Sequence, residues 1–348
     1  MAKRTRVLVV DDSAFVRKVV TQMLSRSAGL EVVAAARDGE EALALAEQYR
    51  PDVITLDLVM PRMSGVEFLH AQNARRRVPV VICSIAHQSG ALALEALEAG
   101  AVDFVQKPTA LATDRVYEIA DELIAKVETA ASVGVGAARP PLAAAPPAAA
   151  PVARPSGPLR TDVVVLGIST GGPQALRQLI PRLPSNFPVP IAMVLHMPVG
   201  YTEMYARRLN EISALDVREA TDGDVLQPGV AWLAPAGRHL TFVRGADGRT
   251  RAHLDLRPAD TQHRPAVDVL FRSAADVFGP RVLGVVMTGM GSDGLLGAAH
   301  IKAQGGRIAT EAESSCVVYG MPRAVVEASL SDRSAALDDM AIAITELI

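Results

Sequence analysis

Short apolar runs alternate with amphipathic segments over residues 6–125, and this alternation predicts strands that are each followed by a helix. Five such units predict an α/β fold, with a parallel sheet covered by helices on both faces. The predicted strands are residues 6–10, 31–35, 53–56, 80–83 and 101–105. The helix after the first strand is predicted to pack through an apolar stripe of Phe15, Val16, Val19, Val20, Met23 and Leu24.

The composition changes abruptly over residues 128–160. Alanine and proline dominate this segment, and proline disfavours both helices and sheet ladders. We therefore expect an extended spacer with polyproline character that acts as a passive tether. The sequence predicts two domains, at residues 1–125 and 159–348, joined by an Ala/Pro-rich linker at 126–158.

Residues 161–348 again alternate between predicted strands and helices, which favours a second doubly wound, Rossmann-like parallel sheet. The apolar run at 163–168 leads into a glycine-rich turn, and Pro173 suits the start of the helix that follows. The remaining expectations are buried strands at 191–195 and 282–287, short strands and turns at 222–243, and a closing helix from residue 338 onward.

Polar residues follow the predicted strands of the first half at their carboxyl ends, where α/β folds place functional groups. Asp11 and Asp12 follow the first strand, and Asp57 follows the third. Carboxylates that converge repel one another, so a hard cation such as Mg²⁺ is predicted among them. Ser84 and Lys107, which follow the fourth and fifth strands, would complement a transferred phosphoryl group.

These residues belong to segments that resemble the receiver domain of two-component response regulators. The segments are VVDDS at 9–13, LDLVMPRMSG at 56–65 and DFVQKP at 103–108. The resemblance implies a flavodoxin-like fold that takes a phosphoryl group from a histidine kinase. The residues that it implies are Asp57 for phosphorylation, Asp11, Asp12 and Asp57 for Mg²⁺, Lys107 for the phosphate, and Ser84 with Phe104 as the switch pair.

In the second half, Ser169 lies in the glycine-rich turn GISTGG at 167–172. A strand, a tight turn and a helix form the context in which a serine is exposed as a nucleophile. The same pattern also suits a turn that binds a phosphate, so this segment alone leaves both interpretations open.

His196 follows the predicted strand at 191–195, and Asp293 lies just past the predicted strand at 282–287. Because parallel strands end at the same edge of a sheet, these two residues and Ser169 can meet there as nucleophile, base and orienting acid. Their order along the chain differs from that of α/β-hydrolases, so we expect a different doubly wound fold. The competing histidines, none directly after a strong strand run, are His239, His253, His263 and His300.

The composition argues against several classes of partner and location. A net charge of -3 gives no reason to expect nucleic acid or an anionic membrane as a partner. Two isolated cysteines, Cys83 and Cys316, support neither a disulfide framework nor a metal cluster. The first apolar run is too short for a signal peptide and no uncharged stretch is long enough to span a membrane, so a cytoplasmic location is expected.

The second half resembles the catalytic domain of chemotaxis protein-glutamate methylesterases. The resemblance implies an esterase that demethylates glutamate methyl esters on chemoreceptors, deamidates receptor glutamines and needs no cofactor in this domain. The segments that carry it are GISTGG at 167–172, HMPVGYT at 196–202, APAGRH at 234–239, RPAVDVLF at 264–271, TGMGSDG at 288–294 and SCVVYGMP at 315–322.

The same resemblance implies roles for single residues. Ser169 would attack the acyl carbon, His196 would carry the proton, and Asp293 would orient the imidazole. Backbone amides near Met290 would hold the oxyanion, and Thr170 would support the histidine or the substrate. The receiver domain is expected to restrain this site until it is phosphorylated by the chemotaxis histidine kinase.

Two other interpretations stay open at this point. One is a phosphorylation-switched binding protein without catalysis, which the complete set of Ser169, His196 and Asp293 disfavours. The other is a nucleotide-binding oxidoreductase, which lacks the acidic residue expected on the strand after the first helix of such a domain. A monomer is the default expectation for the oligomeric state.

Overall fold

The computed structural model describes residues 3–84, 90–107, 113–132 and 161–348. The chain divides into two compact units, and each is described by itself. Most of the predicted linker, residues 133–158, and Pro108 of the receiver-like segment lie outside the described residues.

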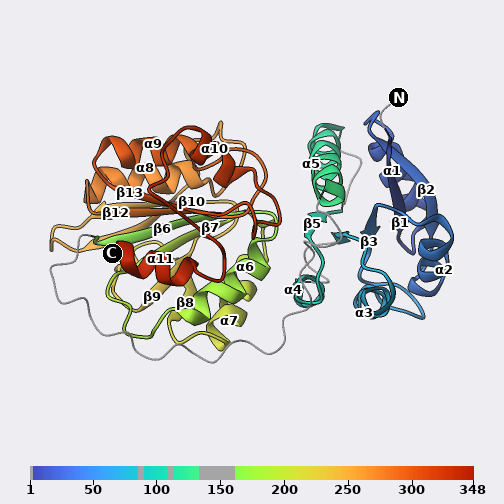
Figure 1. Ribbon diagram of the computed structural model, residues 1–348, viewed down its shortest axis with the longest axis horizontal. Helices are drawn as coiled ribbons and strands as arrows, with labels where there is room; N and C mark the ends of the chain where they lie inside the picture. The colour runs from blue at the N-terminus through green and yellow to red at the C-terminus, as the bar shows by residue number, and fades with distance from the viewer. Residues whose placement is uncertain (1–2, 85–89, 108–112, 133–160) are drawn as a thin grey trace. The chain divides into compact units, whose positions relative to one another are not determined.

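The first unit is built on a parallel sheet with the strand order β2-β1-β3-β4-β5. A helix follows each strand, which confirms the predicted α/β architecture (Figure 1). Helix α1 packs against α5, and α3 packs against both α2 and α4. The strands are β1 (Thr5–Val10), β2 (Leu30–Ala36), β3 (Val53–Leu56), β4 (Val80–Ser84) and β5 (Asp103–Gln106), and the helices are α1 (Ala14–Leu24), α2 (Gly39–Tyr49), α3 (Gly65–Arg75), α4 (Gly90–Glu98) and α5 (Thr113–Ser132).

Helix α1 buries only part of its predicted apolar stripe. Val20, Met23 and Leu24 are buried, but the Phe15 side chain is 59% exposed. The helix begins at Ala14, so Phe15 lies in its first turn, past the carboxyl end of β1, where no strand continues beneath it. The prediction that Phe15 joins the packed face is therefore wrong.

Helix α5 continues past residue 126, where the linker was predicted to begin. Val127 and Ala130 are fully buried, and the Lys126 ammonium pairs with the carboxylates of Asp103 and Glu122. These contacts keep residues 126–132 in the helix, so the predicted start of the linker is too early by the last turns of α5.

The second unit is built on a seven-stranded parallel sheet with the order β14-β13-β12-β6-β7-β9-β8. This topology confirms a second doubly wound sheet. Its first strand in the chain, β6, lies in the middle of the sheet between β12 and β7. The strands are β6 (Val163–Ile168), β7 (Ile191–Leu195), β8 (Asp216–Glu219), β9 (Val230–Leu233), β12 (Val282–Val286), β13 (Arg307–Glu311) and β14 (Arg333–Ala335).

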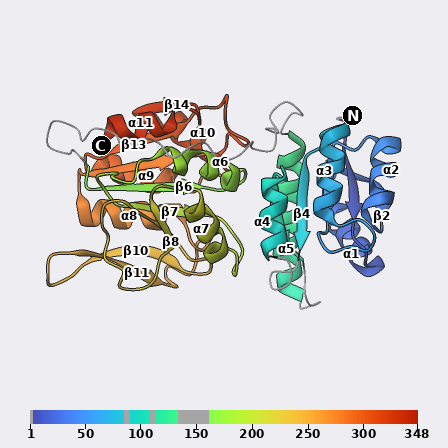
Figure 2. The same cartoon turned by 90° about the horizontal axis from the view of Figure 1, so that it is seen from below.

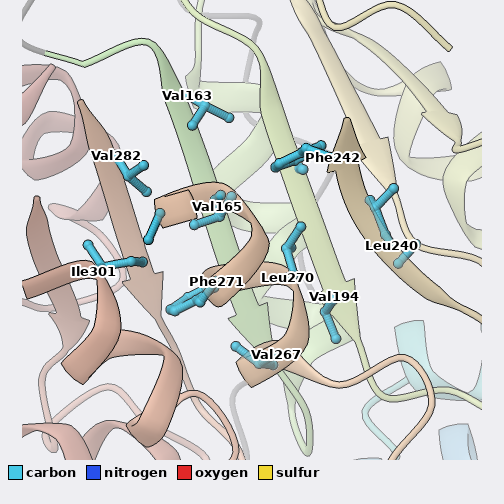
Figure 3. Close-up of a cluster of buried hydrophobic side chains, with 14 of the residues drawn as sticks. Val163, Val165, Val194, Leu240, Phe242, Val267, Leu270, Phe271, Val282 and Ile301 are labelled. Carbon is cyan, nitrogen blue, oxygen red and sulfur yellow. The ribbon is translucent and has the colours of Figure 1, made fainter. Parts of the chain in front are cut away.

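Helices cover both faces of this sheet, with α8, α9 and α10 on one side and α6, α7 and α11 on the other (Figure 1). On the first side, Val267, Leu270 and Phe271 of α8 join one buried hydrophobic cluster with residues of the sheet and of the following elements, and all three are fully buried (Figure 3). The helices are α6 (Gly172–Leu179), followed by a 3₁₀ turn (Ile180–Arg182), then α7 (Thr202–Glu211), α8 (Val267–Phe278), α9 (Leu295–Ala303), α10 (Met321–Glu327) and α11 (Met340–Leu347).

One element departs from the purely parallel architecture. Strands β10 (His239–Arg244) and β11 (Thr250–Asp255) form an antiparallel hairpin outside the seven-stranded sheet. The hairpin lies beside α8 (Figure 2), against which Leu240 and Phe242 are buried. Its strands fall partly within the stretch at 222–243 that was predicted to form short strands and turns.

Gly65, the first residue of α3, offers a test of the packing in the first unit. A Cβ atom at this position would lie 2.3 Å from the Asp57 carbonyl oxygen and 2.8 Å from the Leu58 Cα, and both of those atoms are backbone. We expect Gly65→Ala to destabilise the full chain by roughly 1–3 kcal/mol, as overpacking does in well-packed cores. Calorimetric unfolding measures this, with Gly29→Ala as the control, since a Cβ there makes only ordinary contacts. Equal unfolding midpoints for the two variants would contradict the expectation.

Candidate functional site

Three loops meet at the carboxyl edge of the seven-stranded sheet, after the adjacent strands β12, β6 and β7. Ser169 directly follows β6 and His196 directly follows β7. The backbone N–H of Ser169 donates to the Thr288 carbonyl at 3.0 Å, and that of His196 donates to the Ile168 carbonyl at 3.2 Å. These bonds extend the sheet by one residue on each side of β6 and hold the three loops together.

His196 and Asp293 form a direct side-chain pair. His196 Nε2 lies 2.9 Å from Asp293 Oδ2, and the two side chains are only 9% and 12% exposed. The backbone N–H groups of Val267 and Asp268 donate to the same carboxylate, at 2.8 and 2.9 Å. The structure therefore brings together two of the residues that the sequence predicts for one site.

The Asp293 carboxyl is ionised at neutral pH. Burial raises its pKa, but the hydrogen bond and charge of His196, together with the amides of Asp268 and Val267, outweigh burial and hold the pKa below its usual range. Because an ionised carboxylate only accepts, His196 Nε2 carries the proton that it shares with Asp293. The other ring nitrogen, Nδ1, is buried without a hydrogen-bond partner among the described residues.

Ser169 lies so close to Gly289 that no side chain fits at position 289. A Cβ atom at Gly289, in the loop after β12, would lie 2.8 Å from the Ser169 Cβ. The Gly289 carbonyl accepts from the amides of Gly320 and Met321, at 3.1 and 2.9 Å. The loop that contains Met290 thus packs closely against Ser169, and hydrogen bonds from the start of α10 hold it in place.

Buried polar contacts hold the neighbouring residues of the same two loops. The Thr288 hydroxyl donates to the Thr170 carbonyl at 3.0 Å and accepts from the Val318 amide at 2.9 Å. The Thr288 amide donates to the carboxylate of Glu311, a fully buried residue at the end of β13, at 3.0 Å. These bonds anchor the segment around Thr288 at several points, and electrostatic stabilisation of a transition state requires donors that are held in place in this way.

The competing histidines occupy other positions. His239 is fully buried, with Nδ1 accepting from the Ala266 amide and Nε2 bonded to the Pro258 carbonyl. His253 and His300 pair with surface carboxylates. His263 is different, because its ring stacks on His196 with the centroids 4.0 Å apart. Sequence reasoning passed over His263, although it directly precedes the segment RPAVDVLF.

In the first unit, Asp11, Asp12 and Asp57 form an acidic pocket at the carboxyl edge of the sheet. One oxygen atom from each lies within 4.8 Å of the others. Lys107 extends its ammonium to Oδ2 of Asp11 and Oδ2 of Asp57, both at 2.7 Å. Three oxygen ligands in this arrangement fit a hard divalent cation. The structure therefore brings together four of the residues predicted for this pocket.

Burial governs the electrostatics of this pocket. It raises the pKa of Asp57, with a further contribution from Asp11, while Lys107 and the Leu58 amide act in the opposite direction. Burial alone would lower the pKa of Lys107, but the hydrogen bonds and charges of Asp11 and Asp57 raise it. Lys107 thus compensates the negative charge at Asp57 only in part, and a further cation would favour the ionised form.

The predicted switch residues lie on the strands next to this pocket. Ser84 is buried at the end of β4, and its carbonyl accepts from the Lys107 amide at 2.8 Å. Phe104 is buried on β5, in register with Ile82. Sequence reasoning missed Arg17, whose Nη1 donates to the carbonyls of Asp11 and Asp12, at 2.7 and 3.0 Å.

Two family models match the chain, one in each unit of the structure. The family model described as CheB methylesterase matches residues 164–344, and the model of the response regulator receiver domain matches residues 7–116. The chain belongs to the CheB methylesterase family. The first match spans more than half of the chain, and the two matches fall on the two units of the structure.

Relatives in this family match nearly the whole length of the chain. Protein-glutamate methylesterase/protein-glutamine glutaminase 5 of Myxococcus xanthus is 54% identical over 338 residues, which are 96% of this chain and 95% of that protein. The Pyrococcus horikoshii protein of the same name, without the number, is 41% identical over 336 residues, covering 95% and 90% of the two chains. The crystal structure of the Thermotoga maritima CheB methylesterase catalytic domain has 39% sequence identity and a TM-score of 0.53, and it covers 54% of this chain and 99% of that chain.

Within residues 3–84, 90–107, 113–132 and 161–348, no helix is both long and apolar enough to cross a membrane.

The raised pKa of Asp57 predicts how stability depends on pH. Below about pH 4 this carboxyl is protonated in both the folded and the unfolded chain. As the pH rises, the unfolded chain ionises first, so the folded state loses stability. In metal-free buffer at pH 7, we therefore expect Asp57→Asn to unfold at a higher temperature than the wild type, with a difference that shrinks towards pH 4. The exposed Asp12 supplies the control, Asp12→Asn, which should change the midpoint less. A lower midpoint for Asp57→Asn at pH 7 would show that the ion pair with Lys107 outweighs burial.

Proposed function

We propose that the C-terminal domain, from residue 159 onward, hydrolyses γ-methyl esters of glutamate side chains on chemoreceptors and γ-amides of receptor glutamines. The products would be methanol or ammonia and a free carboxylate. The observation that carries the proposal is the buried pair of His196 and Asp293 at the sheet edge that also presents Ser169. Relatives named protein-glutamate methylesterase/protein-glutamine glutaminase support the same reaction.

The reaction begins when Ser169 Oγ attacks the γ-acyl carbon and its proton passes to His196 Nδ1. This ring nitrogen takes the proton because Nε2 already donates to the Asp293 carboxylate. The imidazolium is stabilised by the ionised Asp293 and returns the proton to the departing methoxide or amine. Water then attacks the acyl-enzyme by the same route, which releases glutamate and restores the Ser169 hydroxyl.

The oxyanion that forms on the acyl carbon needs fixed donors nearby. The backbone amide of Met290 is the proposed donor, because the Thr288–Gly289 segment before it is anchored by Glu311 and by the start of α10. Thr170, buried next to Ser169, is the proposed supporting residue for the histidine or the substrate. No cofactor is required for these steps.

The N-terminal domain is proposed to accept a phosphoryl group at Asp57 from a chemotaxis histidine kinase. Asp11, Asp12 and Asp57 would hold Mg²⁺, which would neutralise the incoming phosphate. Lys107 would pair with the phosphate once Asp57 is modified, since its ammonium already contacts both buried carboxylates. Movement of Ser84 and Phe104 would then report the modification to the rest of the chain.

These reactions define the partners and the compartment that we propose. The chain would act in the cytoplasm, with chemoreceptors as substrates and a histidine kinase as phosphodonor, without inserting into the membrane. Neither nucleic acid nor a second copy of the chain is needed for the reaction, so a monomer is the proposed state.

Loss of the proposed nucleophile tests the catalytic function. Ser169→Ala should lower methanol release from a chemoreceptor preparation carrying glutamate methyl esters by at least about 10³-fold, because no covalent intermediate can form. Ser213→Ala is the matched control, since its hydroxyl only bonds to the Leu209 carbonyl in the last turn of α7. Equal release by Ser169→Ala and the wild type would remove the serine from the mechanism. A wild type that binds the receptor but releases no methanol would point to a switched binding protein.

Phosphorylation is tested with a small phosphodonor and Mg²⁺ on the wild type and on Asp57→Asn. We expect the rate of the wild type to rise about tenfold or more, in line with a switch worth one or two kcal/mol, and that of Asp57→Asn to stay at the basal level. Asp121→Asn, an exposed carboxylate paired with Arg26, should respond like the wild type. An equal rise in Asp57→Asn would assign the response to another residue.

A further inference from the structure

Two neighbouring helices of the catalytic domain begin without a capping side chain of their own. Helix α8 follows Ala266 and α9 follows Gly294, and neither residue has a side-chain acceptor for the free N–H groups of the first turn. The two helices pack directly against each other (Figure 1). The free N–H groups of each helix therefore need an acceptor from elsewhere in the fold.

Each helix is capped by an aspartate from the first turn of the other helix or from the residues just before it. Asp293, just before α9, accepts from the N–H groups of Val267 and Asp268 at the start of α8. Asp268 Oδ1 in turn accepts from the N–H groups of Gly294 and Gly297 at the start of α9, at 3.0 and 2.6 Å. The two carboxylates thus form a reciprocal pair of caps across the helix contact.

Asp268 consequently holds Asp293 in two ways. Its backbone N–H fixes Asp293 Oδ1, which leaves Oδ2 facing His196 Nε2. Its side chain fixes the amide of Gly294, the residue joined to Asp293 by the next peptide bond. We infer that Asp268 is a positioning residue for the esterase reaction, which sets the orientation of the Asp293 carboxylate toward the catalytic imidazole. The inference rests on the proposed roles of Asp293 and His196.

The electrostatics explain why two carboxylates are tolerated so close together. Burial raises the pKa of Asp268, and the neighbouring charge of Asp293 adds to this, whereas the amides of Gly297 and Gly294 act in the opposite direction. Each carboxylate faces the positive end of a helix dipole, which favours an anion. The helix N-termini supply part of the compensation, together with His196 at Asp293 and Arg272 at Asp268.

A cap that serves only the fold would behave differently from a positioning residue. Loss of such a cap lowers stability but leaves turnover of the folded enzyme unchanged. Loss of a positioning contact lowers kcat in the folded enzyme, since a displacement of about 1 Å at a catalytic group can cost about 100-fold. The two roles are separated by measuring kcat, KM and the His196 hydrogen bond at a temperature where every variant is folded.

The experiment compares Asp268→Ala, Asp268→Asn and the control Asp332→Ala in the full chain. The Asn side-chain oxygen can still accept from the amides of Gly294 and Gly297, so Asp268→Asn is the conservative rescue. The Asp332 carboxylate accepts from the Ile308 amide and pairs with Lys302, and Ile308 lies near the start of β13, at the opposite edge of the sheet from Ser169. Asp332→Ala should lower stability without changing kcat.

For methanol release from methylated chemoreceptor, we expect Asp268→Ala to lower kcat about 100-fold with KM changed less than about twofold, and Asp268→Asn to stay within about tenfold of the wild type. A second readout is the proton on His196 Nε2, observed by proton NMR and assigned by its loss in His196→Gln. It should persist in Asp268→Asn and disappear or broaden in Asp268→Ala. Should the alanine variant not fold, Asp268→Ser takes its place, since its single, shorter oxygen should lower kcat in the same direction.

An unchanged kcat and an unchanged Nε2 proton in folded Asp268→Ala, or in its Ser substitute, would overturn the inference and leave Asp268 as a structural cap. Equal losses of kcat in Asp268→Ala and Asp332→Ala would do the same. A wild type that releases no methanol would refute the proposed function instead, and the NMR signal would still report whether Asp268 orients the pair.

Discussion

The catalytic domain depends on an ionised carboxylate that is buried and hydrogen-bonded to an imidazole. Asp293 is mostly withdrawn from water, and burial alone would favour its protonated form. Its charge is retained because it has donors on every side: the His196 ring and two amides at the start of α8. The position of α8, deep between the sheet and the β10–β11 hairpin, is therefore a requirement of the chemistry as well as of the core (Figure 3).

The receiver domain meets the same problem with a different solution. Asp11 and Asp57 are buried at a sheet edge, and the ammonium of Lys107 bridges them. A buried cation that contacts two carboxylates balances charge only in part, since burial still raises the pKa of Asp57. The catalytic domain compensates its carboxylate with the His196 side chain and two backbone amides, whereas the receiver pocket still favours the added positive charge of a cation.

The sequence was sufficient to predict both parallel sheets and the placement of polar residues at the ends of their strands. Period and apolarity are local signals, and a residue such as His196 or Asp57 directly follows a buried run. Contacts that depend on packing between helices were not predictable in this way. In the sequence, Asp268 is an ordinary acidic residue in the first turn of a helix, and His263 follows no strand. Neither pattern predicts that the residue lies near His196.

The errors have the same origin. Phe15 fits the helical period of α1, but the period does not show where β1 stops beneath the helix. The predicted linker begins at residue 126, but burial of Val127 and the pairing of Lys126 with Asp103 extend α5 beyond that residue. In both cases the sequence pattern was read correctly, and a neighbour distant in sequence decided the outcome.

The loop after β12 carries two of the proposed functions within a few residues, with the Met290 amide near the acyl oxygen and the Asp293 carboxylate on the imidazole. Anchors at Thr288 and at Gly294 fix both of its ends. Insertion or deletion of one residue between these anchors would displace both the Met290 amide and the Asp293 carboxylate. The length of this loop is therefore constrained twice, once by the oxyanion donor and once by the acid that orients the imidazole.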